Sequence, residues 1–307
     1  MNRQIPMRLR MFMALFLGSA VGDGLLLPPA YGQTVPRPSR ATAKLKAWRP
    51  LGHIDDPAVT ECSGIVASRK YPGIFWVHND SGHQAVLYAI RGTGEVVAEV
   101  PVAGGKNIDW EDIATDDRGF LYIADSGNNF GMFPIRSIYQ VTEPDPFAEP
   151  VQPAQVVKRF KYAYTGKRFD AEGLFVREGT FWIISKPRGS RGAIYRLEPG
   201  QKGKLRPVQV APLPLTGVTA ADLSPDGKTL VVGTSYSVTV FAVNSDGIPT
   251  DPATAVTVRF PSGDVEGCCF DGNDVMVTSE PGSVYRIPAA DLAAGTRFVH
   301  PKQLPPG

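Results

Sequence analysis

A short sequence pattern occurs five times along the chain and constrains its fold more than any other feature. Aligned on an acid, a small or acidic residue and an apolar residue, the copies are ECSGIVAS at 61, DWEDIATD at 109, DAEGLFVR at 170, TAADLSPD at 219 and DVEGCCFD at 264. Each copy passes through a Gly-containing turn into a second apolar run, such as GFLYIADS after the second copy. Because self-similarity of this kind marks repeat architectures, we treat each copy and its continuation as one structural unit.

Two further strand-like runs follow in most copies. The third runs are VLYAI, SIYQV, AIYRL, VTVFAV and SVYRI, and the fourth are GEVVAEVPV, QVVKRFKYAY, RPVQVAPL and AVTVRF. All are rich in β-branched and aromatic residues and are bounded by Gly, Pro, Asn or Asp, which is typical of β-strands. A four-stranded unit that recurs every 45 to 61 residues predicts an all-β chain folded as a β-propeller.

The fifth copy lacks a strong fourth run, and residues 46–54, KAWRPLGHI, stand where one would be expected. We therefore predict that this N-terminal strand completes the last blade and closes a ring of five four-stranded blades. A six-bladed propeller is the alternative, because the 61-residue interval between the second and third copies has room for a further blade.

The N-terminus has the pattern of an export signal. Arg3, Arg8 and Arg10 precede the apolar run MFMALFLGSAVG, and residues 30–32 place small side chains at both positions that a signal peptidase reads. The apolar run is too short to span a bilayer, so we expect no stable membrane anchor. We predict a signal peptide at 1–32, a flexible lead at 33–45 and a single propeller domain at 46–307, exported to the periplasm or the extracellular medium.

The charge of the remaining chain argues against a nucleic-acid partner. Loss of the first 32 residues leaves 29 basic and 29 acidic side chains, so the positive footprint of a nucleic-acid-binding protein is absent. We expect a monomer that binds a small polar ligand or a protein partner on one propeller face.

The propeller architecture brings many of the acids to one face. The first strand of each blade lines the central channel, so the start of each motif and the end of each second strand share a face. The outer residues on this face are Glu61, Asp109, Asp170 and Asp264, and the second strands end there at Asp80, Asp125, Lys186 and Glu280. Two residues into the motif, Glu111, Glu172 and Glu266 enter the channel.

Carboxylates gathered in this way raise one another's pKa values or require a counter-ion. A hard cation such as Ca²⁺, or another divalent cation, suits such a set of oxygen ligands. The predicted metal ligands are Glu111, Asp125, Asn128, Asp170, Glu172 and Glu266. The predicted contacts of a polar ligand are Glu61, Asp80, Asp109, Lys186 and Glu280. The alternative is structural, because an acid at the start of a channel strand can accept hydrogen bonds from backbone N–H groups of the next blade.

Two loops on the same face carry Asp-Ser-Gly. In ADSGNNFG, Gly127 permits a close approach of the backbone. In HNDSGH, Ser81 has His78 and His83 nearby and is conceivable as a nucleophile, but no G-x-S-x-G elbow accompanies it.

The three cysteines lie in the first and last copies, which ring closure makes neighbours. Cys62 either forms a disulfide with Cys268 or Cys269, which suits an exported protein, or all three remain buried thiols.

The motifs E-x-S-G-I at 61–65, D-W-E-D-I-A at 109–114, D-A-E-G-L at 170–174 and D-V-E-G at 264–267 resemble the exported SdiA-regulated propeller family. More distantly, they resemble phytase-like, esterase-like and gluconolactonase/regucalcin-type propellers. The resemblance spans residues 46 to about 290, and its nearest family implies a five-bladed ring.

The lactonase-type relatives imply a divalent metal at the channel mouth, held by a Glu, an Asn and an Asp, with an acid acting as a base. The matching positions are Glu111 or Glu172 for the Glu, Asn128 or Asn129 for the Asn, and Asp125 or Asp170 for the Asp. The spacing of that family is not reproduced here, and the denser acidic set of phytase-type propellers is missing.

Three functions remain open at this point. The first is a non-catalytic exported propeller that binds a divalent cation and a polar ligand. The second is a metal-dependent lactonase- or esterase-type hydrolase that uses the same carboxylates, and the third is a protein-interaction scaffold. Only four His and the lack of a defined triad favour the first over the second, and no catalytic residue is assigned.

Overall fold

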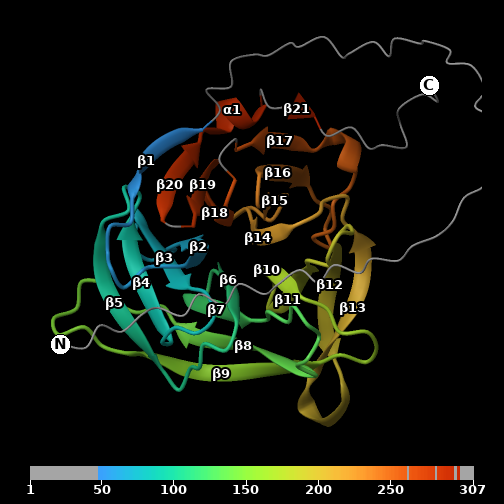
Figure 1. Cartoon of the computed structure of the whole chain (residues 1–307), viewed down its shortest axis with the longest axis horizontal. Coiled ribbons are helices and arrows are strands. Elements are labelled where there is room, and N and C mark those ends of the chain that lie inside the picture. Colours follow the sequence, from blue (N-terminus) through green and yellow to red (C-terminus); the bar gives the residue numbers. More distant parts are fainter. Residues whose placement is uncertain (1–47, 261–262, 281, 294–295, 298–307) are drawn as a thin grey trace, which may run out of the picture. The chain divides into compact units, whose positions relative to one another are not determined.

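The strands of the protein follow the sequence repeat closely. The computed structural model describes residues 48–260, 263–280, 282–293 and 296–297 (Figure 1), all within the unit Lys44–Gly307. The predicted signal peptide at 1–32 and lead at 33–45 lie outside the described residues. Strands dominate and the described residues include one α-helix, α1 (Ala289–Ala293), so the all-β prediction is confirmed.

Five groups of strands correspond to the five sequence copies. The first group is β2 (Cys62–Ala67), β3 (Ile74–Asn79), β4 (Val86–Arg91) and β5 (Val96–Ala103). The second is β6 (Trp110–Thr115), β7 (Phe120–Asp125), β8 (Ile135–Thr142) and β9 (Ala154–Ala163). The third is β10 (Ala171–Arg177), β11 (Thr180–Ser185), β12 (Ala193–Pro199) and β13 (Leu205–Pro212). The fourth is β14 (Val218–Leu223), β15 (Thr229–Thr234), β16 (Ser237–Ala242) and β17 (Val256–Arg259), and the fifth is β18 (Val265–Asp271), β19 (Asp274–Ser279) and β20 (Ser283–Ile287).

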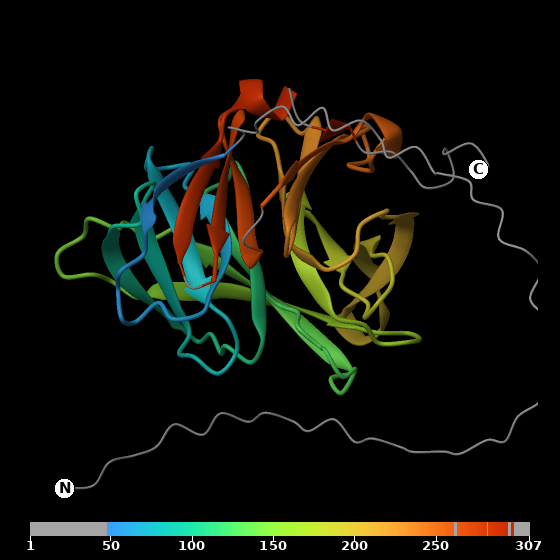
Figure 2. The ribbon, with the colours of Figure 1, turned by 45° about the horizontal axis from the view of Figure 1, so that its top comes forward.

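Antiparallel pairing joins successive strands within every group. The N-terminal strand β1 (Arg49–His53) pairs antiparallel with β20 and becomes the fourth strand of the last group. Figures 1 and 2 show β1, in blue, beside the red strands from the other end of the described chain. The first strands of the groups lie innermost, and each contacts the next, from β2 through β6, β10 and β14 to β18, which contacts β2 again.

The long interval between the second and third copies contains no further strand group. Residues 126–170 are all described, and between β7 and β10 they form only β8, β9 and their connecting loops. The additional residues of this interval lengthen strands β8 and β9, which have 8 and 10 residues. Strand β9 also makes short parallel pairings with β5 and β13, so the outer edges of three neighbouring groups are linked.

The apolar core fills the spaces between neighbouring groups. Trp76 of β3 and Trp110 of β6 belong to one buried cluster, and Phe175 of β10 and Phe241 of β16 to another. None of these four rings is measurably exposed. Burying a large apolar side chain contributes on the order of 2 kcal/mol, so packing between groups holds the inner strands in place and fixes the side chains they present at both ends.

Candidate functional site

A β-bulge at the repeated motif aims the acidic side chains. The pairing register of the first and second strands shifts across Glu111, Glu172 and Glu266, which leaves each of them without a partner in the ladder. The same shift falls on Thr219 in the fourth copy and on Gly64 in the first. An extra residue in one strand re-aims its side chain relative to the neighbours. Because of the bulge, the side chain of each motif Glu and that of the residue after it point in different directions.

These glutamates line a cavity of about 160 Å³, which we call the acidic pocket. Its walls hold six carboxylates and one ammonium group. The lining residues are Glu61, Cys62, Ser63, Asp80, Glu111, Asn129, Glu172, Lys186, Glu266 and Glu280. Seven of the residues predicted as metal or ligand contacts are therefore brought together here, and Asp109, Asp125, Asn128 and Asp170 lie outside the immediate lining.

Among the acids of the pocket without a partner in the described chain, Glu111 is the most buried. Its side chain is buried, with 5% of the residue exposed, and within the described part of the chain its carboxylate accepts no hydrogen bond and forms no ion pair. Burial, followed by the nearby charge of Glu172 and other carboxylates, raises the pKa of Glu111 well above its usual range. A buried carboxyl group without a donor either takes up a proton or, when ionised, needs a bound cation.

Two groups of carboxylates meet at Glu111. Ligand oxygens of Asp80, Asp109 and Glu111 all lie within 4.8 Å of one another, and so do those of Glu111, Asp170 and Glu172. The second group has internal partners, because Asp170 Oδ1 accepts a hydrogen bond from the Asn128 N–H at 2.6 Å. Glu172 Oε2 likewise accepts one from Lys186 Nζ at 2.7 Å. In the first group Asp80 Oδ1 accepts the Ser81 N–H at 2.5 Å, whereas the carboxylates of Asp109 and Glu111 accept no hydrogen bond within the described residues.

Burial and mutual repulsion raise the pKa values of several of these acids, so that binding of a cation would displace protons from them. Burial, with the charges of Asp80 and other acids, raises the pKa of Asp109 to about 6. Burial similarly raises the pKa of Glu266 to about 7, and nearby Lys186 only partly offsets it. A bound cation would favour the ionised forms and release these protons.

Gly127 leaves room beside the first group of carboxylates. A Cβ at this position would lie 2.0 Å from Glu111 Oε1 and 2.4 Å from Asp109 Oδ2. The close approach of backbone expected at Gly127 is thus an approach to these two acids.

Two predicted metal ligands make internal contacts instead. Asp125 Oδ1 lies 3.0 Å from Arg136 Nη2, with the two side chains 2% and 1% exposed. The Asn128 amide accepts a hydrogen bond from the Phe133 N–H at 3.0 Å and donates one to the Phe133 carbonyl at 2.9 Å, which closes its own loop. Neither residue belongs to the two carboxylate groups. Arg136 was missed at the sequence level, although an Arg inside the strand-like run IRSIYQV was a visible signal.

Asp112 has the bracing role that the sequence offered as the alternative for these acids. It is fully buried, and its carboxylate accepts hydrogen bonds from the N–H groups of Ile113, Leu174 and Ala221 at 2.9, 2.8 and 3.0 Å. Asp222 similarly accepts one from the Phe270 N–H at 2.9 Å. Asp112, one residue beyond the bulge of its strand, and Asp222, three residues beyond the bulge of its own, thus join the inner strands, whereas the motif glutamates face the pocket.

The remaining predicted groups have structural partners. His83 Nε2 lies 3.0 Å from Thr60 Oγ1, and buried His78 Nδ1 lies 3.0 Å from the Asn79 carbonyl. Within the described chain neither ring contacts the Ser81 hydroxyl, so the arrangement gives no support to a serine nucleophile. All three cysteines are buried and free.

Comparison with known proteins gives only distant likenesses. No protein-family model and no curated protein matches the chain. Among solved structures it is similar to a PQQ-bound aldose sugar dehydrogenase from Streptomyces coelicolor, with 8% identity, 78% of this chain and 97% of that chain covered, and a TM-score of 0.46. A gluconolactonase from Xanthomonas campestris gives 13% identity, 80% and 92% coverage and a TM-score of 0.45. A family AA12 carbohydrate-active enzyme from Trichoderma reesei is 11% identical, with 78% of this chain and 96% of that chain covered and a TM-score of 0.45. Likenesses at this level leave function open, and the SdiA-regulated resemblance stays a prediction.

Proposed function

We propose that this chain is an exported β-propeller whose acidic pocket binds a divalent cation, with Ca²⁺ the best candidate, together with a small polar ligand. One observation carries the proposal, namely the buried carboxylate of Glu111, which has no hydrogen-bond donor in the described chain. Asp80 and Asp109 provide two further carboxylates, with ligand oxygens within 4.8 Å of that of Glu111.

The residues present fit such an ion. Ca²⁺ takes six to eight oxygen ligands in flexible geometry, and Asp80, Asp109 and Glu111 would supply carboxylate oxygens. The Asn129 amide lines the same pocket, and the remaining ligand positions are left for water or for hydroxyl and carboxylate groups of a bound molecule. Lys186 is the internal competitor, but its ion pair is with Glu172, and it acts on Asp80 and Glu111 only through its nearby charge.

Calcium titration of the purified protein by calorimetry, after treatment with chelator, tests the proposal. We expect saturable binding and a rise in the thermal unfolding temperature with Ca²⁺. Glu111→Gln should weaken binding by about tenfold or more, a loss of roughly 1.4 kcal/mol. Glu99→Gln, which removes an exposed carboxylate of β5, is the matched control and should bind like the wild type. Absence of saturable binding, or equal binding by both variants, would refute the proposal.

We also propose that the five strand groups are the blades of a five-bladed propeller closed by β1. The cyclic contacts of the first strands and the pairing of β1 with β20 support this arrangement. Export and a monomeric state are proposed on the sequence alone. Among the described residues, no helix combines the length and apolar character needed to cross a membrane.

A metal-dependent lactonase or esterase is the second candidate. It is favoured by Glu266, because a carboxyl group in the acidic pocket whose pKa is raised by burial to about 7 suits a general base near neutral pH. A panel of lactones and aryl esters, assayed with and without Ca²⁺, separates the two functions. Turnover that depends on both Ca²⁺ and Glu266, lost in Glu266→Gln, would establish hydrolysis, whereas calcium binding without turnover would leave the binding function alone.

A further inference from the structure

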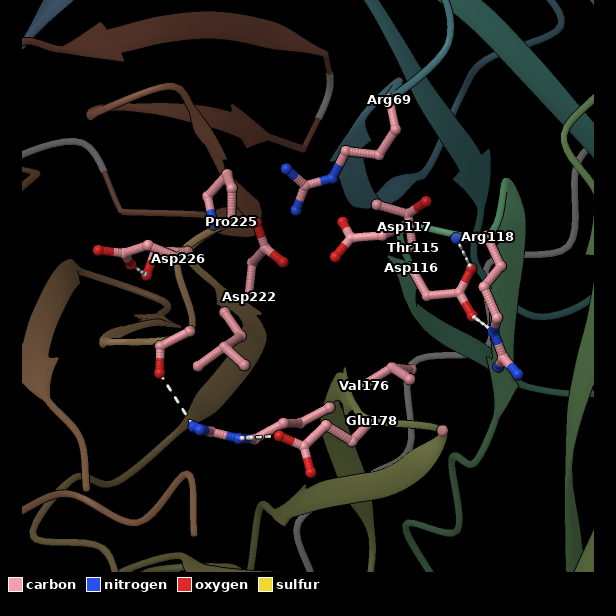
Figure 3. Close-up of a pocket in the computed structure, with 15 residues that line it drawn as sticks. Arg69, Thr115, Asp116, Asp117, Arg118, Val176, Glu178, Asp222, Pro225 and Asp226 are labelled. Atoms are coloured by element: carbon pink, nitrogen blue, oxygen red, sulfur yellow. Dashed lines mark hydrogen bonds and ion pairs between the residues drawn. The ribbon is translucent and has the colours of Figure 1, made fainter. Parts of the chain in front are cut away.

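A second and larger cavity lies at the opposite ends of the inner strands. It has a volume of about 380 Å³ and is lined by residues of the turns between first and second strands in the first four groups (Figure 3). We call it the hairpin pocket. The motif glutamates stand at the start of the inner strands, whereas this pocket lies where those strands end, so it is separate from the acidic pocket.

Several charges at this cavity already have partners. Arg118 Nε lies 2.8 Å from Asp116 Oδ2, and Arg177 Nη1 donates a hydrogen bond to the Gly227 carbonyl at 2.9 Å. Asp226 Oδ1 accepts hydrogen bonds from Ser224 Oγ at 2.7 Å and the Lys228 N–H at 3.1 Å. These contacts hold the turns and are not available to a ligand without being broken.

Two charged groups of the same pocket have no partner within the described residues, and a third, Asp222, has backbone partners only. Arg69 and Asp117 are exposed, and neither forms a hydrogen bond or an ion pair within the described residues. Asp222 lies deeper, with 7% of the residue exposed, and Oδ2 accepts the Phe270 N–H. In Figure 3 the Arg69 guanidinium and the carboxylates of Asp117 and Asp222 point into one space. Arg69 is near enough to lower the pKa of Asp222, against the larger effect of burial, yet no ion pair joins them.

This arrangement selects a class of ligand. A guanidinium and carboxylates that face each other across a cavity without touching leave a gap that one molecule with both signs of charge can bridge. A dianion would meet two carboxylates, and a dication would meet the guanidinium. The described lining includes no aromatic ring on which the face of a sugar could stack. The volume is within the range of small-molecule sites.

We propose that the hairpin pocket binds a small zwitterion of the amino-acid type, with its carboxylate on Arg69 and its ammonium group between Asp117 and Asp222. The planar guanidinium can hold a carboxylate through two parallel hydrogen bonds. The buried carboxylate of Asp222 would orient the ammonium group at the floor of the cavity.

Calorimetry on the full chain tests this site with glycine and 4-aminobutyrate as zwitterions and with acetate and methylammonium as single-charge probes. We expect saturable binding of at least one zwitterion, about tenfold tighter than either single-charge probe. Arg69→Gln and Asp117→Asn should each weaken that binding by about tenfold. Lys70→Gln, an exposed cation of the same turn outside the pocket lining, should leave it unchanged.

Because the three variants alter exposed side chains, loss of binding will not reflect misfolding, and circular dichroism verifies this. The proposal is overturned if no zwitterion binds at millimolar concentration, if a single-charge probe binds as tightly, or if Arg69→Gln and Asp117→Asn bind like the wild type. Binding of the zwitterion does not require calcium. The result of this experiment is therefore independent of whether the acidic pocket binds a cation.

Discussion

The carboxylate of Asp112 accepts a hydrogen bond from the backbone N–H of Ala221, 3.0 Å away and 109 residues further along the chain. The same oxygen accepts the Leu174 N–H at 2.8 Å. One buried side chain therefore joins β6 to β10 and β14 near the centre of the inner strands. Burial raises the pKa of Asp112 well above its usual range, although three N–H donors oppose that shift.

Asp112→Ala should destabilise the protein strongly. The change leaves the N–H groups of Leu174 and Ala221 buried without acceptors, and each such group costs about 1–3 kcal/mol. We expect the free energy of unfolding, measured by urea denaturation with tryptophan fluorescence, to fall by about 3 kcal/mol or more. Asp117→Ala, at an exposed turn position, should change it by less than about 0.5 kcal/mol. A loss below about 1 kcal/mol for Asp112→Ala would show that the hydrogen bonds are replaced by water.

Asp112 also illustrates what could be predicted from the sequence. The five copies and their strands were readable because apolar runs and turn residues recur in a fixed order, and the all-β class followed. The bracing role of Asp112 was not readable, because an Asp suits a ligand as well as a backbone acceptor and the bulge at Glu111 has no signature in residue type. Asp125 was expected at a metal because its partner, Arg136, becomes visible only once the pairing of β7 and β8 is known.

Asp125 and Arg136 should be strongly coupled in stability. Removing one member of a buried ion pair leaves an uncompensated charge and costs about 3–5 kcal/mol. We expect Asp125→Ala to be destabilised by that amount, and the double variant with Arg136→Met to lose much less than the sum of the single variants. A double-mutant cycle by urea denaturation measures the coupling. If Asp125 acts chiefly as a metal ligand, its substitution would instead remove the effect of chelator, and the coupling with Arg136 would be small.

The three cysteines should be unreactive in the folded protein. Burial raises the pKa of Cys62 to about 12 and also raises the pKa values of the Cys268 and Cys269 thiols. Since the thiolate is the reactive form, we expect no reaction with a thiol reagent at pH 8 until the chain unfolds. Unfolding without reductant should then expose all three thiols. Recovery of a single thiol would reveal one disulfide among the three cysteines, and peptide mapping would show whether Cys62 takes part in it.

His78 should make stability depend on pH in the mildly acidic range. Burial lowers the pKa of its imidazole from 6.5 to about 4, so the unfolded chain binds a proton more readily than the folded one. The contribution is present in full above pH 6.5 and is lost as the pH falls toward 4, by roughly 3 kcal/mol in total.

Asp222 acts in the opposite direction, because burial raises its pKa to about 6 and folding then favours its protonated form as the pH falls. The comparison must therefore be between wild type and His78→Gln, measured as free energy of unfolding from pH 7 to 4. We expect the wild type to lose stability relative to the variant as the pH falls, because only the wild type carries the His78 contribution. An NMR titration of the His78 ring with a midpoint near 6.5 would contradict the predicted burial of its charge.

Gly127→Ala should weaken calcium binding without harming the fold. Gly127 does not have a positive φ, so alanine can adopt its backbone conformation. The added Cβ would nevertheless lie 2.0 Å from Glu111 Oε1, and the carboxylates of Glu111 and Asp109 would have to move away from it. We expect the calcium-free unfolding temperature to change little and the calcium affinity to fall by about tenfold, or roughly 1.4 kcal/mol. Gly166→Ala is the matched control, because a Cβ there meets nothing within 4 Å. Equal calcium affinity in both variants would place the ion away from Glu111 and Asp109, since a cation held by those two carboxylates cannot be indifferent to a methyl group that displaces them.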